Sequence, residues 1–239
     1  MSDKGHAQVQ LVKPDGTGAH RVALGFWNEQ WDAHRDEPWH GQLATAFRNS
    51  MTALQRHEEA DTRAILHKSG GGPAPADPKQ EARLLDREMT TLESIDLQKI
   101  EADLAARRSA LSPFAVAIDR TDVDGATQRA EQRAIMRGMN PMERLAALRG
   151  GLSEATAAAI LSAPPTSSAL SDEQWTNFRE ARLRQRHPEK LASLDAAAAA
   201  TKLVARTLAA ARSSTRERYL PLLPAAEVEV KPLAPAWVP

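Results

Sequence analysis

The stretch that decides the fold is Leu170–Tyr219, which reads LSDEQWTNFREARLRQRHPEKLASLDAAAAATKLVARTLAAARSSTRERY. Ser171, followed three residues later by Gln174, has the pattern of a capped helix start. Pro188 interrupts the helix, because proline disrupts the hydrogen bonding of a helix interior. After it, apolar and small residues recur at alternating spacings of three and four over residues 191–208. The stretch therefore predicts two helices that pack on other helices.

The composition limits how much core the chain can build for itself. Apolar residues make up 42% of the 239 residues, but alanine dominates them and aromatic residues account for only 4%. Alanine favours helices but buries little area, and hydrophobic stabilisation scales with buried area at about 25 cal/mol per Å². We therefore expect a mainly α, extended multi-helix protein with narrow seams and partners that supply part of the burial. The alternative is a modest helical bundle.

Charge and residue usage exclude several classes of protein. Lys+Arg and Asp+Glu both number 31, so no global charge steers the chain toward nucleic acid or an anionic membrane. The absence of cysteine excludes disulfides, cysteine zinc sites and cysteine nucleophiles. Residues 1–4 lack the apolar run of a secretory signal. No run approaches the roughly 18 apolar residues of a membrane helix, so we expect no membrane segment.

Glycine and proline clusters divide the chain into five segments. Residues 1–68 predict a short β-hairpin followed by a helix, and residues 69–78 predict a flexible Gly/Pro linker. Residues 79–118 predict a long helix, and residues 119–219 a C-terminal helical region. Residues 220–239 predict an extended, Pro-rich C-terminal arm.

Capping residues mark three helix starts within the C-terminal region. They are Asn140 with Glu143, Ser153, and Ser171 with Gln174. Short helices with tight turns are also typical of helix-turn-helix DNA readers. Residues 141–163 show no cluster of basic or amide side chains on a recognition helix. We therefore expect a compact helical region that does not read DNA there.

Four runs carry a resemblance to known proteins: NPMERL at 140–145, EATAAAILSAPP at 154–165, LSDEQW at 170–175, and His187-Pro188. Together they resemble uncharacterised helical proteins of tailed bacteriophages and prophages. The resemblance implies a phage-encoded virion or assembly component. It implies no catalytic residues.

Two tryptophans, a helix seam and the arm are candidates for a partner interface. Trp27 and Trp31 share one face of a helical turn, and tryptophan is enriched at binding hot spots. Trp237 is the candidate anchor of the arm. The candidate seam consists of Leu191, Leu194, Ala198, Thr201, Ala205 and Leu208. The alternatives are that the two tryptophans form a local core and that the seam packs within the chain.

Two polar clusters were considered as metal sites. The first groups Asp32, His34, Asp36, Glu37 and His40, which are metal-ligand types. No recognised ligand spacing is present and Pro38 interrupts the helical register, so a solvated loop is predicted. His57 and Asp61 are predicted to form a surface pair on a helix. We therefore expect no metal and no cofactor.

An arginine cluster is the candidate contact to nucleic acid. It consists of Arg179, Arg182, Arg184 and Arg186. Dense arginines contact phosphates in many proteins. However, acidic residues between 172 and 189 nearly balance them. We therefore expect a mixed solvated face or ion pairs between subunits.

These observations favour a non-enzymatic structural or interaction protein of a multi-subunit assembly, in a tailed-phage virion or its assembly. It would localise to the virion, and to the host cytoplasm during assembly. Its expected partners are other virion or assembly proteins and copies of itself. The alternative is a nucleic-acid-binding or DNA-packaging accessory protein that uses residues 179–186. A third class, a hydrolase or metal-dependent enzyme, rests only on the cluster at 32–40.

Overall fold

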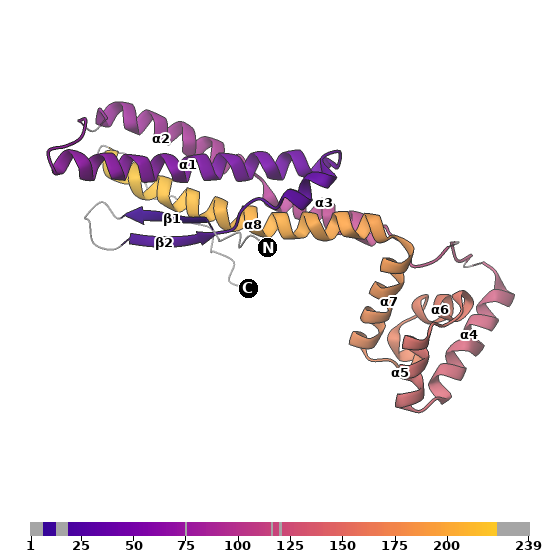
Figure 1. The fold of residues 1–239 in the computed structure, drawn as a ribbon. Helices are drawn as coiled ribbons and strands as arrows, with labels where there is room; N and C mark the ends of the chain where they lie inside the picture. Colours follow the sequence, from indigo (N-terminus) through magenta and orange to yellow (C-terminus); the bar gives the residue numbers. More distant parts are fainter. Residues whose placement is uncertain (1–6, 13–18, 75, 116, 120, 224–239) are drawn as a thin grey trace. The chain divides into compact units, whose positions relative to one another are not determined.

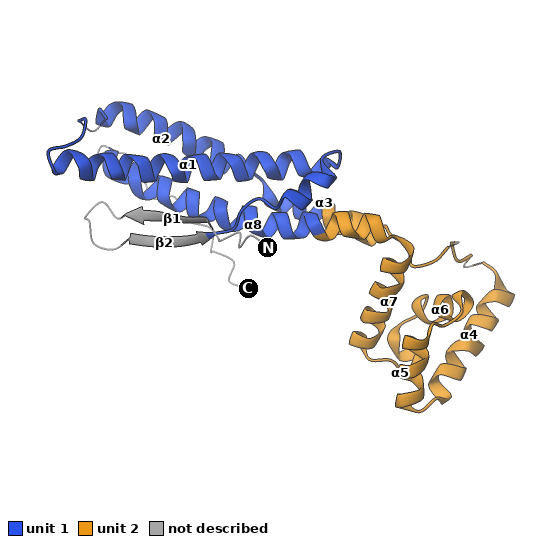
Figure 2. Ribbon diagram, viewed as in Figure 1, with its two compact units in different colours: residues 1–102, 196–239 blue, residues 103–195 orange. Residues whose placement is uncertain are grey.

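The computed structural model describes residues 7–12, 19–74, 76–115, 117–119 and 121–223, with side chains from Leu24 onward. This part of the chain is mainly helical, which confirms the mainly α character of the predicted fold class (Figure 1). It divides into two compact units (Figure 2): unit 1 comprises residues 1–102 and 196–239, and unit 2 comprises residues 103–195. Two helices, α3 (Leu97–Ser109) and α8 (Pro188–Tyr219), each have residues in both units.

Two short strands precede the helices. β1 (Ala7–Val12) and β2 (Ala19–Leu24) pair antiparallel, with Ala7 opposite Leu24 and Val12 opposite Ala19. The side chains before Leu24 lie outside the described part of the chain. The backbone of β1 lies against α1 (Pro38–Lys68).

Besides the first residues of α3, three helices build unit 1. They are α1 (Pro38–Lys68), α2 (Pro78–Glu93) and the C-terminal part of α8, preceded by the turn η1 (Glu29–His34) and followed by η3 (Leu220–Leu222). The predicted Gly/Pro linker at 69–78 coincides with the connection between α1 and α2. That connection joins two helices of the same unit and does not separate the two units.

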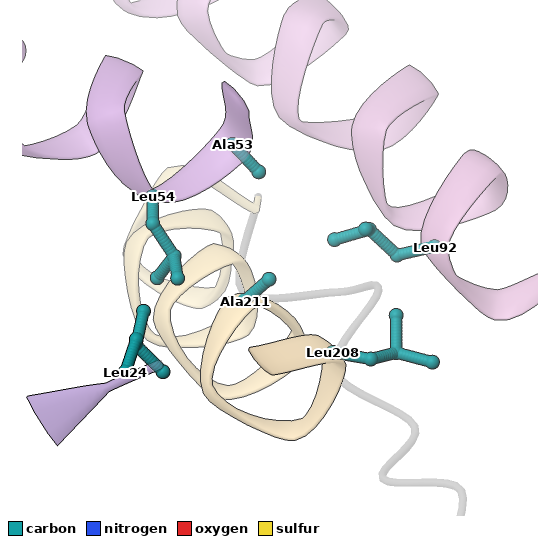
Figure 3. Close-up of a cluster of buried hydrophobic side chains, with 6 residues drawn as sticks. All are labelled: Leu24, Ala53, Leu54, Leu92, Leu208 and Ala211. Atoms are coloured by element: carbon teal, nitrogen blue, oxygen red, sulfur yellow. The ribbon is translucent and has the colours of Figure 1, made fainter. Parts of the chain in front are cut away.

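A buried apolar cluster holds these helices together (Figure 3). Ala53 and Leu54 come from α1, Leu92 from α2, and Leu24 from the end of β2. α8 contributes Leu208 and Ala211, the former 1% exposed and the latter fully buried. Small residues at such positions let helix axes approach closely. This part of α8 therefore packs in the hydrophobic core of its own chain.

The single helix expected over 79–118 is instead two helices, α2 and α3. The break has a local cause, because the Asp96 side chain accepts a hydrogen bond from the backbone N–H of Lys99 at 3.1 Å. Arg212 of α8 donates to the carbonyl oxygens of Leu92 at 2.7 Å and of Ile95 at 3.2 Å. These bonds satisfy carbonyls that a helix end leaves without intrahelical partners. An arginine far away in sequence thus stabilises the end of α2.

Unit 2 contains a compact group of short helices. They are α4 (Val123–Gly138), α5 (Pro141–Gly150), α6 (Glu154–Leu161), the turn η2 (Pro165–Ser168) and α7 (Asp172–Arg186). All three predicted caps are confirmed: Asn140 and Ser171 form complete capping boxes, and Ser153 accepts from the N–H of Thr156. Gly151, with φ of 87°, adopts the left-handed conformation that ends α5.

The helix pair α5–α6 is similar in helix length and turn to a helix-turn-helix motif, but the apolar side of its second helix is buried. In that motif the second helix lies in the major groove. In unit 2 the second helix is α6, and it carries Ala157, Ile160 and Leu161 into the core. Met136 and Phe178 pack in the same cluster. The side of α6 that carries these residues is therefore taken up by the core of unit 2.

Arg144 clamps the end of α4. Its guanidinium donates to the carbonyl oxygens of Met136 at 3.0 Å and Met139 at 2.7 Å, and also to that of Ala169. These are chain segments before and after α5, where Arg144 itself lies. The planar fork of arginine suits donation to several carbonyl oxygens at once. Arg144 therefore fastens the turns of unit 2 to one another.

Candidate functional site

Unit 1 contains a buried hydrogen-bonded set of three polar side chains from three helices. His57 Nδ1 of α1 lies 2.7 Å from Ser214 Oγ of α8, and His57 Nε2 lies 3.0 Å from Glu88 Oε2 of α2. The three residues are 2%, 7% and 8% exposed, in the order His57, Ser214, Glu88. We call this set the His57 relay. Since buried polar groups destabilise a fold unless they are hydrogen-bonded, the relay favours one register of the three helices.

The residue types of the relay also occur in nucleophilic triads. An ionised carboxylate only accepts hydrogen bonds, so in a neutral imidazole Nε2–H donates to Glu88 and Nδ1 accepts from the Ser214 hydroxyl. In hydrolase triads the serine faces a substrate site. Here Ser214 is 7% exposed and lies within α8, hydrogen-bonded to α1. We therefore interpret the relay as a fastener between helices.

Sequence reasoning missed Glu88 and Ser214 and misplaced His57. The surface pair expected between His57 and Asp61 is wrong, because His57 faces the core and Asp61 pairs with Arg218 of α8. The sequence did contain a signal for their burial, which is the position of each residue in the helical repeat. Each relay residue continues a buried stripe with a spacing of three or four. The stripes are Ala53, Leu54 and His57; Leu85, Glu88 and Leu92; and Thr207, Ala211 and Ser214.

An open groove between α1 and α2 runs beside Glu88. Its volume is about 350 Å³. It is lined by Arg48, Asn49, Thr52 and Arg56 from α1 and by Leu84, Arg87, Glu88, Thr91 and Leu92 from α2. Arg56 Nη1 lies 3.4 Å from Glu88 Oε1, so this carboxylate has both a histidine and an arginine as partners. We call this feature the α1/α2 groove.

Trp27 and Trp31 form a local aromatic cluster. Their rings stack edge to face with centroids 4.9 Å apart, and Phe47 of α1 lies 5.7 Å from Trp27. Trp31 is 9% exposed. The two side chains thus pack against the start of the helical unit, as the local-core alternative describes. Trp237, the third candidate anchor, lies outside the described residues.

Asp32 organises the polar cluster at 32–40 without a metal arrangement. Its carboxylate accepts from Arg35 at 3.1 Å and from Trp27 Nε1 at 3.3 Å, and it lies 3.2 Å from His40 Nε2. The hydrogen bonds from Arg35, then Trp27, hold the pKa of Asp32 below its ordinary value. Among the described residues, no three His, Asp or Glu side chains are grouped to hold a metal ion.

The seam of α8 is buried within the chain, and its register differs from the predicted one. Leu191, Leu194 and Leu208 are buried, but Ala198 is exposed and Ala205 is half-buried. Over residues 197–214 the buried stripe follows Ala197, Ala200, Val204, Thr207, Ala211 and Ser214. This stripe has the same alternating spacing of three and four as the expected seam but is shifted by one residue along the helix. Thr201 and Leu208 of the expected seam are buried as well.

Most of the candidate nucleic-acid arginines have partners within unit 2. Arg184 lies 2.9 Å from Asp195 and 3.2 Å from Glu180. Arg182 donates to the Leu152 carbonyl and lies over the Phe178 ring at 5.7 Å. Arg186 lies 4.0 Å from Glu154. These arginines thus form ion pairs within the chain, whereas the sequence predicted a mixed solvated face or ion pairs between subunits.

Comparison with known proteins identified no relative of the chain. Comparison of the chain with protein-family models, with curated proteins and with solved structures found no match. None of the helices in the described part of the chain is both long and apolar enough to cross a membrane.

Proposed function

We propose that the chain is a non-enzymatic interaction protein of a multi-subunit assembly, a component of a tailed-phage virion or of its assembly. The observation that carries this proposal is the exposure of large apolar side chains on α4 and α5. Val123, Ile135 and Met142 are 75%, 56% and 76% exposed. Covering such side chains with a partner removes apolar surface from water, which is favourable by about 25 cal/mol per Å².

The internal use of polar side chains also supports the proposal. The His57 relay, Arg144 and Arg212 fasten helices within each unit. Three of the four arginines of α7 are engaged in ion pairs or carbonyl contacts. The phage assignment itself rests on the resemblance carried by residues 140–190. In this proposal the N-terminal hairpin and the end of the C-terminal arm around Trp237 supply further segments that neighbouring subunits bind.

The test is incorporation into particles. The variant Val123→Asp/Met142→Asp places two charges on the exposed apolar positions, and Val123→Ile/Met142→Leu is the matched apolar control. We expect the charged variant to fold, as judged by circular dichroism, and its amount in purified particles to fall about tenfold, equivalent to about 1.4 kcal/mol. Incorporation of both variants at the level of the unchanged protein would contradict this interface.

The nucleic-acid-binding alternative depends on arginines that are mostly engaged. Among the described residues, Arg179 alone of the four has no recorded ion pair or side-chain hydrogen bond. One uncompensated arginine supports few phosphate contacts. Salt-dependent retention on immobilised DNA that disappears in Arg179→Gln would favour this alternative over the assembly proposal.

A further inference from the structure

The α1/α2 groove carries positive charge that the described part of the chain does not neutralise. Its lining holds Arg48, Arg56 and Arg87 but a single carboxylate, Glu88. That carboxylate already contacts His57 and Arg56. Among the described residues, neither Arg48 nor Arg87 has a carboxylate partner, and both are exposed. The groove therefore favours an occupant with carboxylate or other anionic groups.

The dimensions of the groove favour a short extended segment. Arg48 and Arg56 are eight residues apart on α1, which corresponds to about 12 Å of helix. An extended chain covers this length with about four residues, and alternate side chains then point to the same side. Asn49 and Thr52 offer hydrogen-bonding groups to the backbone of such a segment. The fitting occupant has carboxylates at alternate positions.

The C-terminal sequence of this chain contains such a segment. Glu227-Val228-Glu229-Val230 alternates carboxylate and apolar side chains, and it belongs to residues 224–239, which lie outside the described part. We infer that the α1/α2 groove binds residues 227–230 of the same chain. Glu227 and Glu229 would pair with the guanidiniums of Arg48 and Arg87. This inference does not depend on the proposed function.

The chain can reach the groove from where the described part ends. The turn η3 lies against α2, and the Tyr219 hydroxyl is 3.3 Å from Asp86 Oδ1 of that helix. Four residues lead from Leu223 to Glu227, and extended they span about 13 Å. This is about the diameter of one helix with its side chains, roughly 10–12 Å. The segment therefore has the length to pass α2 and enter the groove.

Disulfide trapping in the full chain tests the inference, because the protein has no cysteine of its own. The test pair is Thr91→Cys with Ala225→Cys, because residue 225 lies on the same side of an extended segment as Glu227 and Glu229. The control pair is Thr90→Cys with Ala225→Cys. Thr91 lines the groove and Thr90 does not. The two threonines are otherwise matched, since both are exposed and each hydroxyl donates to the carbonyl four residues earlier, at 2.9 and 3.0 Å.

The expected result is an intrachain disulfide that forms at least about tenfold faster for the Thr91 pair than for the Thr90 pair. Two ion pairs of modest strength, between the glutamates of the segment and the groove arginines, are enough to hold the segment in place to this extent. Glu227→Gln/Glu229→Gln, or Arg48→Gln/Arg87→Gln, should remove this advantage. Equal rates, a faster Thr90 pair, an advantage that survives loss of the charges, or disulfides only between two chains would each overturn the inference. Circular dichroism of each variant verifies that the fold is retained.

Discussion

His57 Nε2 of α1 lies 3.0 Å from Glu88 Oε2 of α2, and both side chains are buried. The other ring nitrogen of His57 bonds Ser214, which follows it by 157 residues. The His57 imidazole thus links an early helix of the chain, α1, to its late helix α8 within unit 1. Each member of the relay has its hydrogen-bond partner within the unit. Removing one member therefore leaves a buried polar group without that partner.

Glu88→Ala is expected to lower the free energy of unfolding by about 2–3 kcal/mol, because it leaves the buried His57 without its acceptor. Urea denaturation followed by circular dichroism measures this loss. Glu93→Ala, an exposed carboxylate at the end of the same helix, is the matched control and should change stability little. A loss for Glu88→Ala no larger than that of the control would show that the relay does not stabilise unit 1.

Leu208→Ala is expected to destabilise unit 1 by about 2–4 kcal/mol, because it opens a cavity in the apolar cluster of Figure 3. Leu220→Ala removes the same atoms from a side chain that is 41% exposed and should cost far less. Thermal or urea unfolding of the two variants provides the comparison. Similar losses for both would argue against α8 packing in the core of its own chain.

Arg144→Ala is expected to speed amide hydrogen exchange at the end of α4 and to destabilise unit 2 by about 2 kcal/mol, since several carbonyls lose their donor. Arg144→Lys should rescue only part of the loss, because lysine lacks the planar fork. Arg149→Ala, an exposed arginine of the same helix, is the control. The clamp would be refuted by protection at residues 136–139 that stays unchanged in Arg144→Ala.

Acid is expected to weaken unit 2 through Asp195. Burial alone raises the pKa of Asp195, but hydrogen bonds from Arg108 and Arg184 outweigh it and hold the pKa below its ordinary value. A carboxyl with a lowered folded-state pKa stabilises the fold above its unfolded pKa, about 3.9, and loses that contribution as the pH falls through the folded value. Stability should therefore fall below about pH 4.

Asp195→Asn should flatten that part of the pH profile while leaving the slope near neutral pH unchanged. Unfolding curves between about pH 6 and pH 3 measure the effect. The same acid slope in the variant and in the unchanged protein would exclude Asp195 as its source. Because Asp195 is 39% exposed, solvent screening keeps this effect small.

The local signals of the sequence predicted helix ends well and helix partners poorly. Asn140, Ser153 and Ser171 were identified as caps because a cap depends on residues within one turn. The break at residues 94–96 has a local signal, the cap that Asp96 provides to Lys99, which was overlooked. Its other part is long-range, because the donor that satisfies the carbonyls of Leu92 and Ile95 is Arg212, over a hundred residues away. No local pattern contains that information.

The candidate site shows the same limit. His57, Glu88 and Ser214 are ordinary residues in sequence, and only their phase within buried stripes marks them. The arginines at 179–186 were recognised as a cluster, and the nearby carboxylates were correctly expected to balance them. That Arg184 pairs with Asp195 within the chain depended on how α7 and α8 meet inside unit 2.

The copy number of the chain in purified particles tests the central proposal most directly. Quantitative mass spectrometry of phage particles made from the genome that encodes the chain should find it at a constant ratio to the major structural proteins. The ratio should be unchanged by further purification at high salt. Absence of the chain from the particles, together with a monomeric state in analytical ultracentrifugation, would contradict the assignment to a multi-subunit assembly.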